Sequence, residues 1–269
     1  MRVSKQQTPF GDAFLQCTNC KKTLFKREFE QNLSVCTYCG HHQRLTALGR
    51  IELTFDEGSF ESRDLEIESL DTLTFPEYGE KLGQAVVKLG RNDGIMSGYA
   101  ALNGIRCAVA VSDFTFMGGS MGSVAGEKIT RTLERAADDK IPAVIFCASG
   151  GARMQEGLLS LMQMAKTTAA VQRCREAGVP FICVFTDPTM AGVLASYASV
   201  ADVIIAEPKA LVGFAGARVS KQAQVVKAPD NFQTAEFCLQ KGMIDMIVPR
   251  RDLRDTLCSL TSMFMGVAV

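Results

Sequence analysis

Ser149-Gly150-Gly151-Ala152-Arg153 links an apolar run, Pro142–Ala148, to a helical pattern that starts at Met154. This order predicts a strand, a glycine turn and a helix. Adjacent glycines let a ligand approach the backbone closely, and the first N–H groups of a helix have no internal acceptor. We therefore predict an oxyanion site in which Gly150 and Gly151 are the catalytic donors. A tight turn that serves only packing is the alternative interpretation.

Strand and helix patterns alternate on both sides of this turn. Asn103-Gly104 separates two apolar runs and predicts an antiparallel hairpin of 94–102 with 105–111. Further along, the pattern predicts parallel strands at 143–148, 181–185 and 203–206, and helices at 124–139, 155–177 and 192–199. Binding sites in such sheets lie at the carboxyl ends of the strands. A second turn, Thr186–Ser196, which contains Ala191 and Gly192, is therefore expected beside the first.

A third glycine-rich segment, Asp113–Ser123, contains Gly118 and Gly119 and precedes a predicted helix. It could cradle a phosphate, although it matches neither the P-loop nor the dinucleotide fingerprint. A flexible turn at the start of a helix is the alternative interpretation.

The composition is that of an ordinary globular protein. Of 269 residues, 47% are hydrophobic and 22% are charged, which provides ample chain for a buried core. Basic and acidic residues balance at 29 each, so no overall charge directs the chain to nucleic acid or to an anionic membrane. The sequence shows neither an apolar run of membrane-spanning length nor an apolar signal segment, so we expect a cytoplasmic or plastid-stroma location.

Four of the ten cysteines form a metal-site pattern. Cys17, Cys20, Cys36 and Cys39 have the spacing C-x2-C-x15-C-x2-C, which lets four thiolates converge on one tetrahedral zinc. Chance CxxC pairs or a redox dithiol are the weaker interpretation. We predict a zinc ribbon over 1–45, held mainly by one structural zinc, and a larger domain over 46–269. The other six cysteines stand singly and are expected to be reduced, buried small hydrophobes.

The residue types of the larger domain limit its chemistry. Both histidines, His41 and His42, precede residue 43, so this domain cannot build a Ser-His-Asp or Cys-His triad. Ser149 is therefore a poor nucleophile, and the domain has no metal-binding or dinucleotide motif. The remaining mode of catalysis is stabilisation of an oxyanion by backbone N–H groups, in which the substrate or a cofactor supplies the base.

Motifs along nearly the whole chain resemble the carboxyltransferase β subunits of bacterial and plastid acetyl-CoA carboxylase. In the family's order they are Cys17–Cys39 with Gly40-His41-His42, Asp113–Lys128, Ser149–Gly157, Thr186–Thr189, Gly213–Gly216, Phe232–Phe237 and Ile244–Pro249. The resemblance implies an α/β fold, a crotonase-like ββα spiral preceded by the zinc ribbon. It also implies transfer of a carboxyl group from carboxybiotin to acetyl-CoA, which gives malonyl-CoA for fatty-acid biosynthesis.

The same resemblance implies partners. A separate α subunit is expected in an α2β2 assembly, biotin arrives on a biotin carboxyl carrier protein, and biotin carboxylase belongs to the full complex. Two oxyanions form, the thioester enolate and the biotin ureido oxygen, so two facing chains are needed. Biotin takes the substrate proton, and no protein base is required.

The resemblance assigns substrate contacts to several positions of this chain. They are Ser149, Arg153, Gly118, Gly119, Ala191, Gly192 and Gly216. For Arg153, and for Lys128, a helix-start cap or a surface charge is as good an interpretation as a contact with a CoA phosphate.

The chain departs from the family pattern at three places. Met190-Ala191-Gly192 replaces the usual Thr-Gly-Gly, Ala217 stands where proline or arginine is common, and Lys221 replaces a usual glutamate. The first departure bears on the N–H geometry of the second turn.

Three other functions stay open. One is the carboxyltransferase of a related acyl-CoA carboxylase or a decarboxylase, and another is a scaffold that has lost activity. The third is nucleic-acid binding through the zinc ribbon, suggested by Lys21, Lys22, Lys26 and Arg27 and weakened by the balanced total charge.

Overall fold

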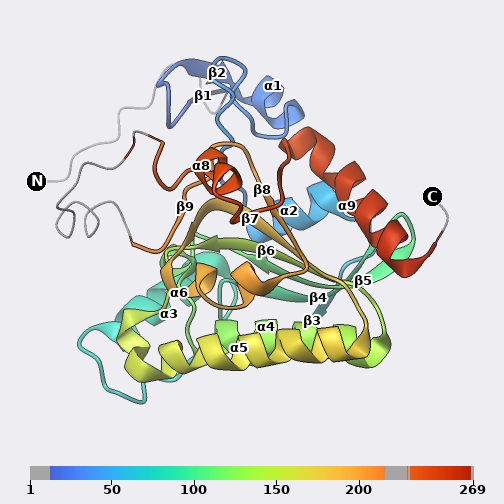
Figure 1. Cartoon of the computed structure of the whole chain (residues 1–269). Coiled ribbons are helices and arrows are strands. Elements are labelled where there is room, and N and C mark those ends of the chain that lie inside the picture. The colour runs from blue at the N-terminus through green and yellow to red at the C-terminus, as the bar shows by residue number, and fades with distance from the viewer. Residues whose placement is uncertain (1–12, 216–228, 230, 268–269) are drawn as a thin grey trace, which may run out of the picture. The chain divides into compact units, whose positions relative to one another are not determined.

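The computed structural model describes residues 13–215, 229 and 231–267 of the chain (Figure 1). Contacts divide the chain into two compact units, Met1–Arg44 and Leu45–Val269. Within the described residues, no helix combines the length and the apolar character that a bilayer crossing needs.

The first unit is a small ribbon. β1 (Phe14–Gln16) pairs antiparallel with β2 (Thr23–Phe25), and α1 (Lys26–Gln31) follows directly. Its buried apolar residues in the described part are Cys17, Leu24, Phe29 and Cys36. A core of this size supplies little folding energy, so the unit depends on a further source of stability.

The second unit contains a mixed sheet with helices on both faces. Its elements, in chain order, are α2 (Ala47–Thr54), β3 (Glu61–Arg63), α3 (Tyr78–Leu89), β4 (Ile95–Leu102), β5 (Ile105–Ser112), α4 (Ser123–Asp139), β6 (Ala143–Ser149), α5 (Gly157–Ala177), β7 (Phe181–Met190), α6 (Ala191–Leu194), β8 (Val203–Ala206), β9 (Val212–Gly213), α8 (Ala235–Gln240), β10 (Met246–Ile247) and α9 (Arg250–Met265). The strand order is β10-β8-β7-β6-β5-β4-β3, and β9 also pairs with β7. The strands from β5 to β10 run parallel, whereas β3, β4 and β5 pair antiparallel.

The β4–β5 hairpin confirms the prediction made from Asn103-Gly104. Ile95 pairs with Ser112, and Leu102 pairs with Ile105. Asn103 and Gly104 have φ of 51° and 77°, the positive values that both central residues of a type I′ turn require. The parallel strands predicted after residue 142 are also confirmed, as β6, β7 and β8.

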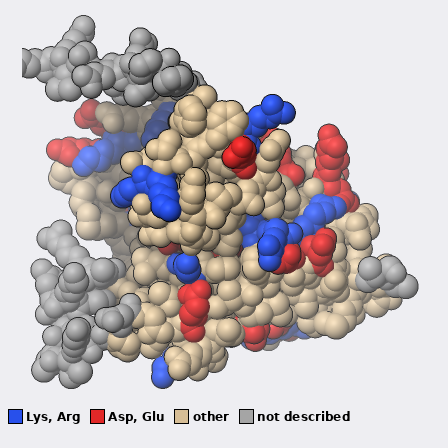
Figure 2. Space-filling view, turned by 90° about the horizontal axis from the view of Figure 1, so that it is seen from above, with Lys and Arg blue, Asp and Glu red and all other residues tan. Residues whose placement is uncertain are grey.

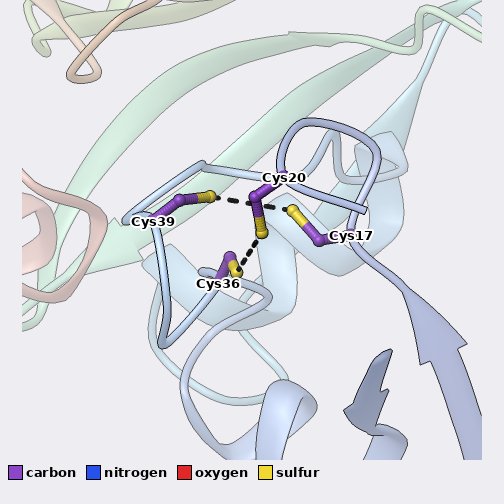
Figure 3. A group of neighbouring side chains, drawn as sticks. All are labelled: Cys17, Cys20, Cys36 and Cys39. Carbon is purple, nitrogen blue, oxygen red and sulfur yellow. Dashed lines mark hydrogen bonds between the residues drawn. The ribbon is translucent and has the colours of Figure 1, made fainter. Parts of the chain in front are cut away.

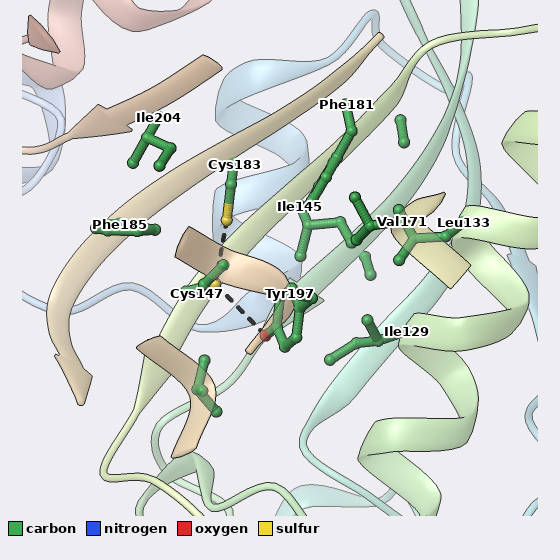
Figure 4. Close-up of a cluster of buried hydrophobic side chains, with 14 of the residues drawn as sticks. Ile129, Leu133, Ile145, Cys147, Val171, Phe181, Cys183, Phe185, Tyr197 and Ile204 are labelled. Atoms are coloured by element: carbon green, nitrogen blue, oxygen red, sulfur yellow. Dashed lines mark hydrogen bonds between the residues drawn. The ribbon is translucent and has the colours of Figure 1, made fainter. Parts of the chain in front are cut away.

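Two apolar cores cover the two faces of the sheet. Figure 1 shows α4 and α5 along one face, with α2 and α9 on the other. The core under α4 and α5 includes Ile129, Leu133, Ile145, Val171 and Phe181 (Figure 4). The core under α2 and α9 includes Ile51, Val144 and Leu257. Val144 and Ile145 face opposite ways because successive side chains of a strand alternate.

The six single cysteines are buried and unbridged, as expected. The sulfur atoms of Cys147 on β6 and Cys183 on β7 lie 3.5 Å apart, and Cys147 also contacts the hydroxyl of Tyr197 (Figure 4). Burial raises the pKa of the Cys183 thiol and the pKa of the Tyr197 hydroxyl well above their usual values. Both groups therefore stay neutral inside the core.

Three segments differ from the sequence predictions. β7 continues to Met190 instead of ending at Phe185, because Thr189 still pairs with β6 and β9. The helix predicted over 192–199 is a single turn, α6, followed by a 3-10 turn at Tyr197–Val200. For the acidic segment 54–75, the lack of a clear period in the sequence predicts a solvated connector with short helical turns, whereas the structure contains β3, which pairs with β4. Long-range pairing decided the first and the last of these, and no local pattern reports such pairing.

Candidate active site

The glycine turn that follows β6 is fixed by the loop that precedes α4. The Met121 N–H donates to Gly151 O at 2.8 Å, and the Arg153 N–H donates to Met121 O at 2.9 Å. These two bonds hold the backbone of the turn at the carboxyl end of a central strand, where ligands of parallel sheets bind.

The helix after the turn begins later than predicted, which changes where the N–H groups point. A 3-10 turn, Met154–Glu156, precedes α5. The Gly150 N–H donates to Gly118 O at 2.9 Å, and the Gly151 N–H donates to Ser149 Oγ at 3.0 Å. The expectation that both groups point outward, unpaired, from a helix start is therefore wrong in this structure. Their catalytic role stays a prediction.

One N–H of the turn, that of Ala152, has no acceptor in the part of the chain that the structure describes. Ala152 is partly exposed, and its nitrogen lies 3.5 Å from the point where a Cβ on Gly192 would sit. This donor therefore lies beside the second turn. The sequence gives no signal for this donor, because only the bonding of its neighbours distinguishes Ala152 from the two glycines.

The structure brings together the three turns that carry the predicted site residues. A Cβ added to Gly119 would lie 1.9 Å from Ala148 O, and one added to Gly151 would lie 2.6 Å from the Cβ of Ala191. Only glycine fits at such distances. The clustered positions are Gly118, Gly119, Gly150, Gly151, Ala191 and Gly192.

Ala191 stands where the family usually has a glycine, and this substitution affects the backbone and the packing of the second turn. Its φ is 49°, in the left-handed region that costs a residue with a Cβ about 1–2 kcal/mol. Its methyl group occupies space beside Gly151 that a glycine would leave open. The departure therefore adds both strain and bulk next to the first turn.

Ser149 serves the geometry of the turn itself. It is buried, and its Oγ accepts the Gly151 N–H and donates to Gly151 O at 3.4 Å. These contacts, the ones found in the described part of the chain, give it no general base. Gly216, also predicted to contact substrate, lies outside the described residues, as do the departures at Ala217 and Lys221.

Arg153 lies in the interior and not at the surface. Its side chain is 1% exposed and pairs with Asp93 at 3.1 Å and with Glu156 at 3.2 Å. Its Nη2 also donates to Ser120 O at 2.8 Å, its Nε donates to Ser120 Oγ at 3.2 Å, and the guanidinium lies over the ring of Phe116. All three guanidinium nitrogens are engaged within the chain. This geometry favours a positioning role over the predicted contact with a CoA phosphate.

Lys128 of α4 is buried as well. Its Nζ donates to Ile95 O at 3.2 Å. Burial lowers its pKa, while the negative charges of Asp93 and Asp64 oppose that effect. Lys128 is therefore neither the surface charge nor the helix cap considered from sequence.

The four cysteines of the ribbon fit a tetrahedral zinc site (Figure 3). Their sulfur atoms all lie within 4.8 Å of one another. The Cys17–Cys39 and Cys20–Cys36 sulfur pairs are each 3.8 Å apart, and Zn–S bonds of about 2.3 Å in a tetrahedron separate sulfurs by about 3.8 Å. Asn19 Nδ2 donates to Cys39 Sγ at 3.6 Å. The ribbon thus holds one structural zinc, as predicted.

Charges of both signs are mixed on the surface. Figure 2 shows Lys and Arg side chains interspersed with Asp and Glu on the face that it displays. Charged side chains also form ion pairs elsewhere on the described surface, such as Arg173 with Glu134 and Asp138. Among the described residues of that face, nothing resembles the continuous basic footprint of a nucleic-acid-binding protein.

Comparisons with known proteins cover both units. The family model described as carboxyl transferase domain matches residues 41–256, and that described as acetyl-CoA carboxylase zinc finger domain matches residues 14–39. The acetyl-coenzyme A carboxylase carboxyl transferase subunit beta of Fusobacterium nucleatum is 50% identical over 246 residues, 91% of this chain and 81% of that protein. This chain belongs to the family of acetyl-CoA carboxylase carboxyl transferase β subunits. The protein of the same name from Synechococcus sp. (strain WH7803) is 48% identical over 97% of this chain and 90% of its own length.

Solved structures share the fold. Transcarboxylase 12S, with hydrolysed methylmalonyl-coenzyme A bound, gives a TM-score of 0.72 at 28% identity. The match covers 88% of this chain but 43% of that one, so this chain spans less than half of its length. A Pseudomonas malonate decarboxylase structure gives a TM-score of 0.67 at 22% identity and covers 87% of this chain and 86% of its own. The predicted fold class, a crotonase-like α/β domain preceded by a zinc ribbon, is confirmed.

Proposed function

We propose that this chain is the β subunit of the carboxyltransferase component of acetyl-CoA carboxylase. It transfers a carboxyl group from carboxybiotin to acetyl-CoA, which gives malonyl-CoA for fatty-acid biosynthesis. The observation that carries the proposal is the cluster of glycine turns at the end of β6, which offers backbone donors. A domain without histidine suits a reaction whose base comes from outside the chain.

The residues of this chain would hold an oxyanion and would not move a proton. Gly150 and Gly151 exchange their present acceptors, Gly118 O and Ser149 Oγ, for an incoming oxygen, and the Ala152 N–H has no acceptor among the described residues. A donor of this kind is worth about 2.7–4 kcal/mol in the transition state. Biotin on its carrier supplies the carboxyl group and accepts the substrate proton.

The other clustered residues shape the substrate site. Gly118, Gly119, Ala191 and Gly192 form its walls, and Gly216 belongs to this set by family resemblance alone. Arg153 acts from behind the turn, since its ion pairs with Asp93 and Glu156 tie together the segments that carry it.

The proposal includes partners and a location. An α subunit supplies the second oxyanion site in an α2β2 assembly, and a biotin carboxyl carrier protein and biotin carboxylase complete the enzyme. The transcarboxylase chain extends well beyond the part that this chain covers, which leaves length there for a second unit. We place the zinc ribbon at 1–45, the crotonase-like domain at 46–269, and the complex in the cytoplasm or the plastid stroma.

The acyl-CoA preference of a reconstituted complex tests this function. The chain is mixed with the α subunit of the same organism and carboxybiotin, and acetyl-CoA is compared with propionyl-CoA. We expect kcat/KM to favour acetyl-CoA by about tenfold or more, because one extra methylene must be rejected. A preference for propionyl-CoA, or biotin-independent decarboxylation of malonyl-CoA as the main reaction, would assign the chain to a related carboxylase or to a decarboxylase.

A further inference from the structure

In the first half of α5 and the 3-10 turn before it, apolar side chains face outward and polar side chains face inward. Its outer face carries large apolar side chains that are 51–71% exposed, namely Met154, Leu158, Leu161 and Met162. Their spacing, i, i+4, i+7 and i+8, places them on one stripe of the helix. Helices of globular proteins normally turn such a stripe toward the core. This one faces outward.

The inner face of the same segment is polar, and its hydroxyl groups bond within the helix, whereas Gln163 Oε1 is buried without a partner among the described residues. Ser160, Gln163 and Thr167 are at most 8% exposed. Ser160 Oγ donates to Gly157 O and Thr167 Oγ1 donates to Gln163 O, both at 2.8 Å. The side chain of Gln163 also fits against Gly126 of α4, where a Cβ would lie 2.6 Å from its Cβ. The helix therefore packs closely on α4 without using its apolar stripe.

The second half of α5 shows the usual arrangement. Ala170, Val171 and Cys174 are buried in the core under the sheet, while Arg173 is exposed and pairs with Glu134. The reversal is thus confined to the end of the helix that adjoins the glycine turn.

A neighbouring segment extends the exposed apolar stripe. Leu73 Cδ1 lies 3.0 Å from the point where a Cβ on Gly157 would sit, and Ser69 Oγ accepts from Arg153 Nη1 at 3.3 Å. Figure 1 shows the chain before α3 beside this end of α5. Leu70 and Leu73 on this segment are 68% and 51% exposed. We call the surface made by Leu70, Leu73, Met154, Leu158, Leu161 and Met162 the apolar face.

The near absence of charge along the α5 part of the apolar face restricts which ligands or proteins can bind there. From Met154 to Ala165 the sequence has one charged residue, Glu156, and its side chain is 2% exposed. Lys166, just beyond, is paired with Glu127 at 2.6 Å. An uncharged apolar stripe suits the apolar surface of another protein chain and offers nothing to a phosphate-rich ligand.

We infer that the apolar face is the surface on which the carboxyltransferase α subunit docks. This inference rests on the proposed function. The face begins at Met154, three residues after Gly151, so a chain bound there lies next to the glycine turns. That is where the reaction needs its second oxyanion site. The α subunit accordingly presents a complementary apolar surface, and α5 is a shared wall of the completed site.

Two charged variants and two controls test the docking surface. Leu158→Glu and Met162→Glu place a carboxylate on the apolar face. Leu158→Met keeps an apolar side chain there, and Met263→Glu places the same charge on α9, where Met263 is 65% exposed. The dissociation constant of the complex with the α subunit of the same organism is measured by sedimentation velocity. Circular dichroism and zinc content of each isolated variant confirm folding.

We expect Leu158→Glu and Met162→Glu to weaken the complex by at least tenfold, and Leu158→Met and Met263→Glu by less than twofold. Unchanged affinity in both charged variants, with a stable wild-type complex, would overturn the docking surface and leave the proposed function standing. Failure of the wild-type chain to bind the α subunit would contradict both the docking surface and the proposed function. Self-association of the isolated chain that both charged variants abolish, without any effect on α binding, would assign the face to a second copy instead.

Discussion

At the scale of single residues, Glu207 is a buried charge that two arginines hold in place outside the glycine turns. It lies at the end of β8 between Arg50 of α2 and Arg250 of α9, with Oε1 2.7 Å from Arg50 Nη1 and Oε2 2.8 Å from Arg250 Nη2. Burial alone would raise the pKa of Glu207, but the two arginines lower it below its usual range. Three elements far apart in sequence thus meet at one carboxylate.

Glu207→Gln is expected to lower the free energy of unfolding by about 3–5 kcal/mol, because it removes the buried carboxylate that pairs with both guanidinium groups. The native pKa is depressed, so the contribution of Glu207 is complete above its unfolded pKa of about 4.3 and is lost as the pH falls below that value. Urea unfolding between pH 6 and pH 3 should show a steeper decline for wild type than for Glu207→Gln. Glu57→Gln, at an exposed position, serves as control, and equal pH slopes in wild type and Glu207→Gln would contradict the prediction.

Gly151→Val should lower kcat of the reconstituted complex by about 10²–10³, the usual loss for one oxyanion donor. Its Cβ would meet Ala191 and crowd the turn. Ser149→Ala should change kcat by no more than about tenfold, because that hydroxyl bonds only to the turn among the described residues. Circular dichroism and zinc content are checked first. Loss of turnover in Ser149→Ala together with near-normal turnover in Gly151→Val would instead indicate a covalent mechanism.

At the scale of elements, the zinc ribbon contains little regular secondary structure. Its strands β1 and β2 are three residues each, and an isolated hairpin of this kind is marginally stable in water. The fold of the ribbon is therefore coupled to zinc binding.

Metal analysis of the purified chain should find one zinc per chain, and Cys36→Ser should lose it. The reason is that three thiolates no longer close the tetrahedral site. Cys258→Ser is the matched control, since Cys258 is one of the single buried cysteines outside the ribbon, and it should keep its zinc. Full retention of zinc in Cys36→Ser would refute the assignment of the four ligands.

At the scale of the whole molecule, the described residues offer one cluster of backbone donors, at one edge of the sheet. The proposed reaction develops negative charge at two places, on the thioester and on the biotin ureido group. One cluster of backbone donors can stabilise one of these two negative charges.

The isolated chain should therefore form malonyl-CoA at a rate at least about 10²-fold below that of the complex with its α subunit, the factor expected for a missing oxyanion donor. The measurement compares initial rates at equal chain concentration, with the α subunit alone as control. Robust carboxyl transfer by the isolated chain would show that it contains both oxyanion sites.

The amino-acid sequence alone determined the zinc ligands, the β4–β5 hairpin, the parallel strands and the family. The first three rest on local spacing, namely CxxC pairs, an Asn-Gly pair between apolar runs, and apolar runs with a fixed period. Such patterns depend on residues that are close together in the sequence. The local structures that they predict are therefore the ones found in the protein. The family rests on its resemblance to motifs that follow one another in the same order along the chain.

Only the tertiary structure decided where each polar group points. It put Arg153 in the interior beside Asp93, bonded the Gly150 N–H to Gly118, left the Ala152 N–H without an acceptor in the described part of the chain and turned the apolar stripe of α5 outward. Each outcome depends on how elements distant in sequence pack against one another. Local spacing contains no information about such partners, because hydrogen-bond acceptors and burial are set by the packing of whole elements.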